Sequence, residues 1–212
     1  MTTAPHDLAI SPTANAVSIG SSAWLSGLPQ YLKSNPADAV MTPAWAAKDM
    51  VEWFKPTGRI LEPCKGFGAI LTQLPDHAEW CEITQGKDFF DWHERVDWII
   101  SNPPYSGFRE WMEHSYEVAD NIVYLCPLNK FFNAYGQIKA CRKHGWVKHI
   151  RNYGTGTKLK FPMGNAIGAM HFVKGWFGET TWSFYDDALK PSNRPWMRAK
   201  NHPDLPAPAG GG

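Results

Sequence analysis

The stretch RILEPCKGFG, residues 59–68, decides the fold class of this chain. A short apolar strand, residues 59–63, leads into a turn that contains Gly66 and Gly68, and residues 69–74 suit a helix after it. A strand, a glycine turn and a helix in this order are typical of open α/β sheets, where ligands approach the backbone beyond the carboxyl end of the strand. The third glycine of a dinucleotide fingerprint and the Gly-Lys-Ser/Thr of a phosphate loop are both absent, which disfavours NAD and ATP.

Helix and strand signals alternate on both sides of this turn. The first helix is expected to have Thr42 as its N-cap and Pro43 at its first position, and to end before Gly58. Further helices are predicted over 108–119 and 134–144, and strands over 80–83, 96–101, 121–126, 146–150, 166–173 and 181–185. This order predicts an α/β fold with a mostly parallel central sheet, helices on both faces and an antiparallel edge.

Composition divides the chain into three parts. Residues 1–35 are rich in Ala, Ser, Thr and Pro and are expected to form a flexible arm, residues 36–188 the folded domain, and residues 189–212 a disordered Pro/Gly-rich tail. We find neither a signal peptide nor an apolar run of about 18 residues, so we expect a cytoplasmic protein, from a bacterium or a phage-infected host, with no membrane contact. The spacing of the four cysteines favours reduced thiols and no metal site.

Charge is distributed unevenly. Residues 1–105 carry twelve acidic and seven basic side chains, whereas residues 106–212 carry eight acidic and fourteen basic ones. Between Asn121 and Gly178 no acid occurs among nine basic residues, which are Lys130, Lys139, Arg142, Lys143, Lys148, Arg151, Lys158, Lys160 and Lys174. A polyanion is the natural partner of such a stretch, although a solvated basic face is the alternative.

Two acidic positions downstream of the glycine turn indicate an adenosine-containing ligand. Glu82 ends the next predicted strand, where a carboxylate can accept hydrogen bonds from both hydroxyls of a ribose. Asp88 then offers an acceptor for an adenine amino group, and Phe89 offers an aromatic ring for the face of the base. Their order predicts an adenosine cofactor that is bound without phosphate recognition.

The tetrapeptide Asn102-Pro103-Pro104-Tyr105 follows the third predicted strand. The Asn102 side-chain oxygen and the Pro103 carbonyl can accept both hydrogens of a base amine, which directs the nitrogen lone pair at an electrophilic methyl group. The two prolines hold the carbonyl in place, a form of preorganisation. Tyr105 offers a flat ring on which an extruded base can stack.

Over residues 38–175 the chain resembles the N6-adenine DNA methyltransferases that use S-adenosylmethionine, through Leu-Glu-Pro-Cys-x-Gly-x-Gly and Asn-Pro-Pro-Tyr. The resemblance implies a Rossmann-like class I methyltransferase fold and methyl transfer to adenine in DNA, double-stranded DNA being the preferred partner and a homodimer one option. The cofactor-binding residues that it implies are Thr42, Pro43, Glu62, Pro63, Cys64, Gly66, Gly68, Glu82, Asp88, Phe89 and Asn102. Those for catalysis are Asn102, Pro103, Pro104 and Tyr105.

The same resemblance implies contacts to the substrate. The family places an aromatic residue from the late β region against the target base, and here Phe161 is the first candidate and Tyr153 the second. Lys130, Lys158 and Lys160, together with Tyr105, complete the expected substrate-binding set.

Three features depart from the family pattern. Lys65 brings a cation close to a positively charged sulfonium unless its side chain turns outward, and Phe67 is bulky between the two glycines. Few residues follow Tyr105 beyond those that complete the sheet, so we expect relaxed or short sequence specificity, as in small phage-type orphan enzymes.

Three other functions stay open at this stage. An RNA adenine or guanine methyltransferase uses similar loops and basic surfaces. A protein-glutamine methyltransferase would hold a side-chain amide in the same loop, but the basic stretch and the Glu-Pro-Cys start of the turn argue against it. The last alternative is a nucleic-acid-binding module that has lost activity.

Overall fold

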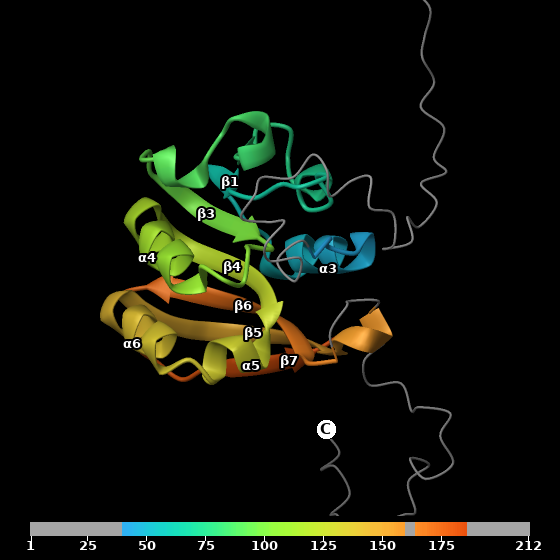
Figure 1. Cartoon of the computed structure of the whole chain (residues 1–212), viewed down its shortest axis with the longest axis vertical. Coiled ribbons are helices and arrows are strands. Elements are labelled where there is room, and N and C mark those ends of the chain that lie inside the picture. Colours follow the sequence, from blue (N-terminus) through green and yellow to red (C-terminus); the bar gives the residue numbers. More distant parts are fainter. Residues whose placement is uncertain (1–39, 160–163, 186–212) are drawn as a thin grey trace, which may run out of the picture.

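The computed structural model describes residues 40–159 and 164–185 (Figure 1), and the side chains of residues 158 and 159 are not described. The expected arm, residues 1–35, and tail, residues 189–212, therefore lie outside the described residues. The described part forms one seven-stranded sheet with the strand order β2-β1-β3-β4-β6-β5-β7. In this part of the chain no helix has both the length and the apolar character needed to cross a bilayer.

The elements follow the predicted alternation. The strands are β1 (Ile60–Glu62), β2 (Glu79–Trp80), β3 (Val96–Ser101), β4 (Ala119–Pro127), β5 (Gly145–Thr155), β6 (Ala166–Lys174) and β7 (Thr181–Phe184). The helices are α3 (Ala44–Phe54), α4 (Phe108–Val118), α5 (Leu128–Phe132) and α6 (Tyr135–His144). Short 3₁₀ turns lie at Leu71–Gln73, Ile83–Gln85, Phe89–Asp91 and Gly156–Leu159.

Strand directions confirm the predicted sheet. β2, β1, β3 and β4 run parallel to one another, and β7 runs parallel to β5. β6 pairs antiparallel with both β4 and β5, so the antiparallel pairing is confined to the C-terminal side of the sheet. The carboxyl ends of β1, β3 and β4 consequently open at the same edge, which is where a parallel sheet binds its ligands.

Helices cover both faces of this sheet, as predicted. In β3, Ile99 packs toward α4 and α6 while its neighbour Ile100 packs toward α3, because successive side chains in a strand point to opposite faces. Figure 1 shows α4 and α6 over the near face. Both isoleucines are fully buried, and burial of a side chain of this size contributes about 1.5–3 kcal/mol.

Two local predictions were wrong, and one short helix was missed. Pro43, and not Thr42, is the N-cap of α3, and it makes no side-chain capping bond. Only the 3₁₀ turn Leu71–Gln73 forms where a helix was predicted over 69–74, because Pro75 holds Leu74 in an extended conformation and leaves too little chain after the turn. The short helix α5 was not predicted at all.

Candidate active site

A cavity of about 820 Å³ opens at the carboxyl ends of β1 and β3. Most of the predicted site residues line it, namely Thr42, Glu62, Pro63, Cys64, Gly66, Glu82, Asp88, Phe89, Asn102 and Pro104. Four of the residues predicted for the cofactor or for catalysis do not: Pro43 caps α3, and Gly68, Pro103 and Tyr105 are buried outside the lining. The structure thus brings together segments that are separated by up to 60 positions in the sequence.

The glycine turn is fastened to Glu82. Gly66 has a φ of +52°, a conformation that favours glycine, and its backbone N–H donates to Glu82 Oε2 at 2.8 Å. Glu82 Oε1 accepts from the backbone N–H and the hydroxyl of Thr84, at 3.1 and 2.7 Å. These bonds hold a nearly buried carboxylate against the cavity with a fixed orientation.

The carboxyl group of Glu62 is buried with only part of its hydrogen-bonding capacity satisfied. It ends β1 and is 1% exposed, and its Oε2 has no hydrogen-bond partner among the described residues. Burial raises the pKa of Glu62 to about 9, and the negative charge of Glu82 acts in the same direction. A buried acid of this kind is suited to a cationic ligand group, which would supply the missing partner.

Lys65 does not direct its charge into the cavity interior. Its ammonium lies over the ring of Trp80, 3.6 Å from the ring centroid, and Lys87 lies over the same ring at 3.7 Å. Such cation–π contacts contribute about 0.5–1 kcal/mol at exposed sites. The expected repulsion between Lys65 and a cationic ligand is thereby relieved. Phe67, the other departure, is 81% exposed and lines the cavity from its rim.

Aromatic rings form a second wall of the cavity. Phe89 is buried and stacks on Trp111, with 4.9 Å between the ring centroids, and Phe90 meets Trp111 edge-on at 5.7 Å. Asp88 is fixed beside them because its Oδ1 accepts from the backbone N–H of Phe90 at 3.0 Å. A flat, neutral ring with an amino group fits between these rings and this carboxylate.

Asn102 lies at the end of β3 with its amide fully engaged. Its Nδ2 donates to the carbonyl oxygen of Val40 at 2.8 Å and to the hydroxyl of Thr42 at 3.2 Å. Its Oδ1 accepts from the hydroxyl of Tyr105 at 2.8 Å. Tyr105 is 6% exposed and packs in the core on the α4 side, so its ring is not the open stacking surface that the sequence suggested.

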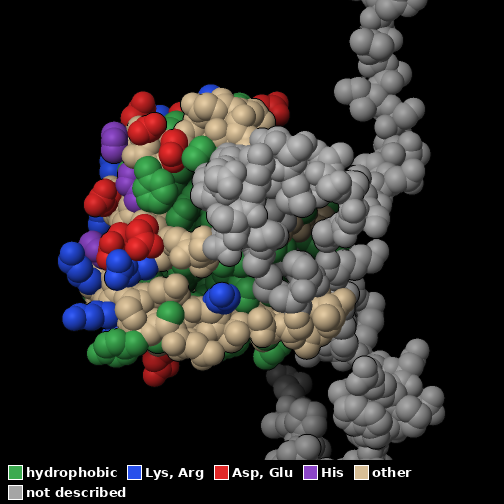
Figure 2. All heavy atoms as spheres, in the orientation of Figure 1, with side chains coloured by type: hydrophobic (Ala, Val, Ile, Leu, Met, Phe, Trp, Pro, Cys, Tyr) green, Lys and Arg blue, Asp and Glu red, His purple; other side chains and the backbone are tan. Residues whose placement is uncertain are grey.

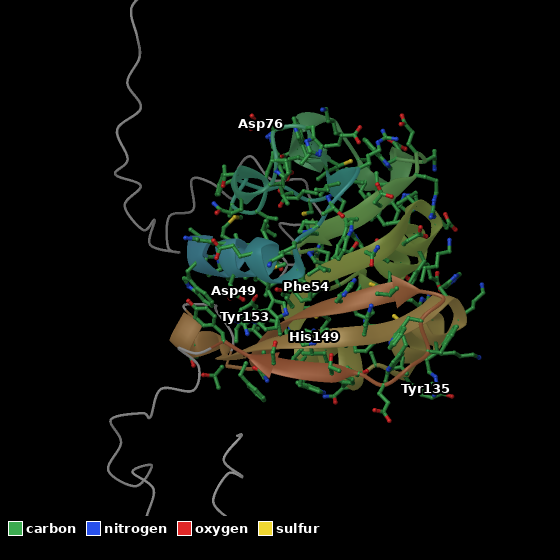
Figure 3. The ribbon with its side chains drawn as sticks, turned by 180° about the vertical axis from the view of Figure 1, so that it is seen from behind. Asp49, Phe54, Asp76, Tyr135, His149 and Tyr153 are labelled. Atoms are coloured by element: carbon green, nitrogen blue, oxygen red, sulfur yellow. The ribbon has the colours of Figure 1, made fainter. Side chains whose placement is uncertain are left out.

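The basic stretch does not form one surface. Arg151 is 7% exposed and makes a bidentate ion pair with Asp49 on α3, with both N···O distances 2.9 Å. Tyr153 donates to the same carboxylate at 2.9 Å and is buried, which removes it from any base-stacking position (Figure 3). On the face shown in Figure 2, most Lys and Arg side chains gather at the side of the molecule where β3 and β4 begin. This side is opposite the carboxyl ends of the two strands.

Few of the proposed substrate contacts can be placed. Lys130 is exposed on α5, directly after the carboxyl end of β4, and therefore lies at the same edge of the sheet as the cavity. Lys160 and Phe161 lie outside the described residues, and so does the side chain of Lys158. Within the described ranges no cluster of three His, Cys, Asp or Glu side chains could hold a metal, and all four cysteines are unpaired thiols.

Several cavity residues were missed by the sequence analysis. They include Val40, Met41, Ile83, Thr84, Ser106, Gly107, Glu110 and Trp111. Thr84 stands two residues after Glu82 and could have been found from that position. Trp111 carries no such signal, because only the packing of α4 against the turn Phe89–Asp91 brings it to the cavity.

Comparison with known proteins identifies structural neighbours. No family model and no curated protein matches the chain. A candidate RNA methyltransferase from Pyrococcus horikoshii is similar with a TM-score of 0.52, covering 72% of this chain and 96% of that chain at 14% identity. The modification subunit of a candidate type I restriction enzyme from Vibrio vulnificus gives 0.52, over 72% and 48% of the two chains at 13% identity.

A third neighbour, the type IIG restriction endonuclease BpuSI, gives a TM-score of 0.56 over 73% of this chain and 28% of that chain, at 13% identity. This chain therefore spans less than half of the length of either restriction–modification protein. At such low identity the likeness concerns the fold. It agrees with the predicted α/β fold and its mostly parallel central sheet, which has seven strands.

Proposed function

We propose that this protein transfers a methyl group from S-adenosylmethionine to the N6 amine of adenine in DNA. The observation that carries the proposal is the meeting of Glu62, Glu82 and Asn102 around one cavity at the carboxyl edge of the sheet. Two carboxylates and an amide suit a cationic nucleoside cofactor and an amine acceptor, respectively. The fold shared with methyltransferases, among them a DNA modification subunit, supports the same reading.

The cavity residues fit S-adenosylmethionine in chemical type. Glu62, with its unpartnered buried oxygen, would hold a cationic part of the methionine portion, and Glu82 would accept from the ribose hydroxyls. Asp88 would accept from the adenine amine beside the stacked rings of Phe89 and Trp111. When bound, the cofactor supplies an electrophilic methyl group on sulfur.

Asn102 would act on the acceptor amine. Its Oδ1 has a second lone pair beside the one that Tyr105 occupies, and it lines the cavity. Accepting one amine hydrogen there favours a pyramidal nitrogen whose lone pair is available for reaction. Positioning of this kind is sufficient to produce large rate effects in displacement reactions.

DNA is proposed as the substrate on the basis of the basic residues near the cavity edge and the Asn-Pro-Pro-Tyr loop. Lys130 is the described member of this set, and Lys158 and Lys160 belong to it by sequence. The proposal includes double-stranded DNA, short or relaxed sequence specificity, and a base that leaves the helix to reach Asn102. A long and strict recognition site in methylation mapped on random DNA would contradict the specificity part.

One experiment tests the proposal against its alternatives. Purified protein is supplied with radiolabelled S-adenosylmethionine and, in parallel, with DNA, RNA and a protein mixture. We expect label in DNA and its loss in Asn102→Ala, while Asn133→Ala, a change of an exposed asparagine at the end of α5, keeps it. Label only in RNA or only in protein would replace the proposal with the corresponding alternative. Tight DNA binding without label would indicate an inactive binding module.

A further inference from the structure

The amide of Asn102 has only one orientation that its neighbours allow. The Val40 carbonyl oxygen, 2.8 Å away, can only accept a hydrogen bond, so the atom that faces it must be the amide nitrogen. The nitrogen's second hydrogen goes to Thr42 Oγ1 at 3.2 Å, and the Tyr105 hydroxyl donates to the amide oxygen at 2.8 Å. Three hydrogen bonds, two to the segment before α3 and one from Tyr105 in the same loop, therefore fix which end of the side chain is the acceptor.

We infer that Val40, Thr42 and Tyr105 are positioning residues that hold Asn102 as an obligatory amide, so that this site excludes aspartate at position 102. This inference rests on the proposed function and deepens it. It assigns the choice between Asn and Asp to the segment that precedes α3, about 60 residues away in the sequence, together with Tyr105 of the loop itself.

The exclusion follows from acceptor chemistry. In an Asn102→Asp variant of unchanged conformation, a carboxylate oxygen would take the place of Nδ2, at hydrogen-bond distance from the Val40 carbonyl with no hydrogen between them. Glu82 and Asp88 line the same cavity, so a further negative charge would be disfavoured. The introduced carboxyl can keep the native arrangement only when it is protonated and donates to Val40.

Thr42 and Tyr105 make different contributions. Thr42 Oγ1 accepts a hydrogen bond from the Asn102 amide, and its own hydroxyl hydrogen remains available to donate. Because Thr42 lines the cavity, it connects the amide to a group bound there. Tyr105 is held in the core and directs its hydroxyl at Oδ1, which leaves the second lone pair of that oxygen for an amine. Its role in this geometry is that of a donor and does not need the ring to stack.

The test compares the pH dependence of two variants with that of the wild type. Asn102→Asp should lower DNA methyl transfer at pH 8 by on the order of 100-fold, and its rate relative to wild type should rise on the order of tenfold per unit as pH falls. Thr42→Val should lose about tenfold in kcat with little change in KM, and Thr42→Ser should restore it. A pH-independent ratio for Asn102→Asp, or equal rates for Thr42→Val and Thr42→Ser, would overturn the inference.

A second readout does not depend on activity. In Asn102→Asp labelled with ¹³C at the aspartate carboxyls, the new resonance should titrate about two units or more above the ordinary value of about 3.9, and higher still when Tyr105→Phe is added. In the wild type the side-chain amide protons of Asn102, assigned by their loss in Asn102→Ala, should exchange slowly, and Thr42→Val should speed the exchange of one. An ordinary pKa together with fast exchange would refute the positioning role. If wild-type protein labels no polymer while both NMR results hold, the proposed function fails and the positioning network stands.

Discussion

Binding of a cationic nucleoside to the cavity should release a proton, because Glu62 is protonated in the ligand-free protein. Burial raises the pKa of Glu62 to about 9, so the neutral acid predominates near pH 7. A cation that supplies the missing partner for Oε2 favours the ionised form. Ionising the group at pH 7 costs about two pKa units, or about 2.7 kcal/mol. The affinity for S-adenosylmethionine should therefore rise about tenfold per pH unit between about pH 6 and 7.5.

Isothermal titration calorimetry in buffers of different ionisation enthalpy measures this proton directly. Between pH 6.0 and 7.5 the ligand's own amino group, with an ordinary pKa of about 7.7–8.0, remains largely cationic. We expect close to one proton released per ligand bound by the wild type. Glu62→Gln should show almost no release and a pH-independent Kd, whereas Glu113→Gln, an exposed position on α4 outside the cavity, should match the wild type. Equal proton release in the wild type and Glu62→Gln would refute the reasoning.

Three further predictions concern stability and binding. Asp49→Ala leaves the buried Arg151 guanidinium without its carboxylate and should lower the free energy of unfolding, measured with urea, by about 3 kcal/mol, while Lys48→Ala should change it by less than about 0.5 kcal/mol. Burial lowers the pKa of His171 to about 4, so the unfolded state takes up a proton first as pH falls from 6.5. The free energy of unfolding should drop by about 3 kcal/mol between pH 6.5 and 4. Denaturation of the wild type and of His171→Phe at several pH values measures this, because the difference between their unfolding free energies should change with pH. A difference that stays constant would contradict the prediction. Lys130→Ala should lower the slope of log K for DNA binding against log salt concentration by about one. Arg142→Ala, at the amino edge of the sheet, should leave this slope unchanged. Equal slopes for the two variants would contradict this placement.

The sequence was sufficient for the sheet and for the floor of the site. β3 (Val96–Ser101) was predicted with its exact bounds, because the two prolines that follow the apolar run end the strand. Glu62, Glu82 and Asp88 were found because each follows a strand or turn whose carboxyl end has to face the ligand. Predictions of this kind need only local pattern and the geometry common to parallel sheets.

The partners of those residues could not be predicted in the same way. Val40 and Thr42 reach Asn102 only because the segment before α3 crosses the carboxyl end of β3, and no periodicity in the sequence reports that crossing. Arg151 was counted with the basic stretch. It is buried, however, and its ion pair with Asp49, 102 positions away, joins β5 to α3. Charge counted along a chain measures composition, and which charges reach the surface depends on tertiary packing.

The sign of the charge inside the cavity separates the two ligands that the proposed reaction needs. Glu62, Glu82, Asp88 and Glu110 line it, and the described cation on its wall, Lys65, stacks on Trp80. Such a lining attracts a sulfonium and an ammonium group but repels phosphates, so a DNA backbone has to remain at the rim near Lys130. A neutral base is the part of the polymer that can enter without electrostatic cost. The acidic interior therefore favours entry of a neutral base over a phosphate. The Asn102 amide favours the same choice, because it can accept hydrogens from an amine but carries no positive charge that would bind a phosphate.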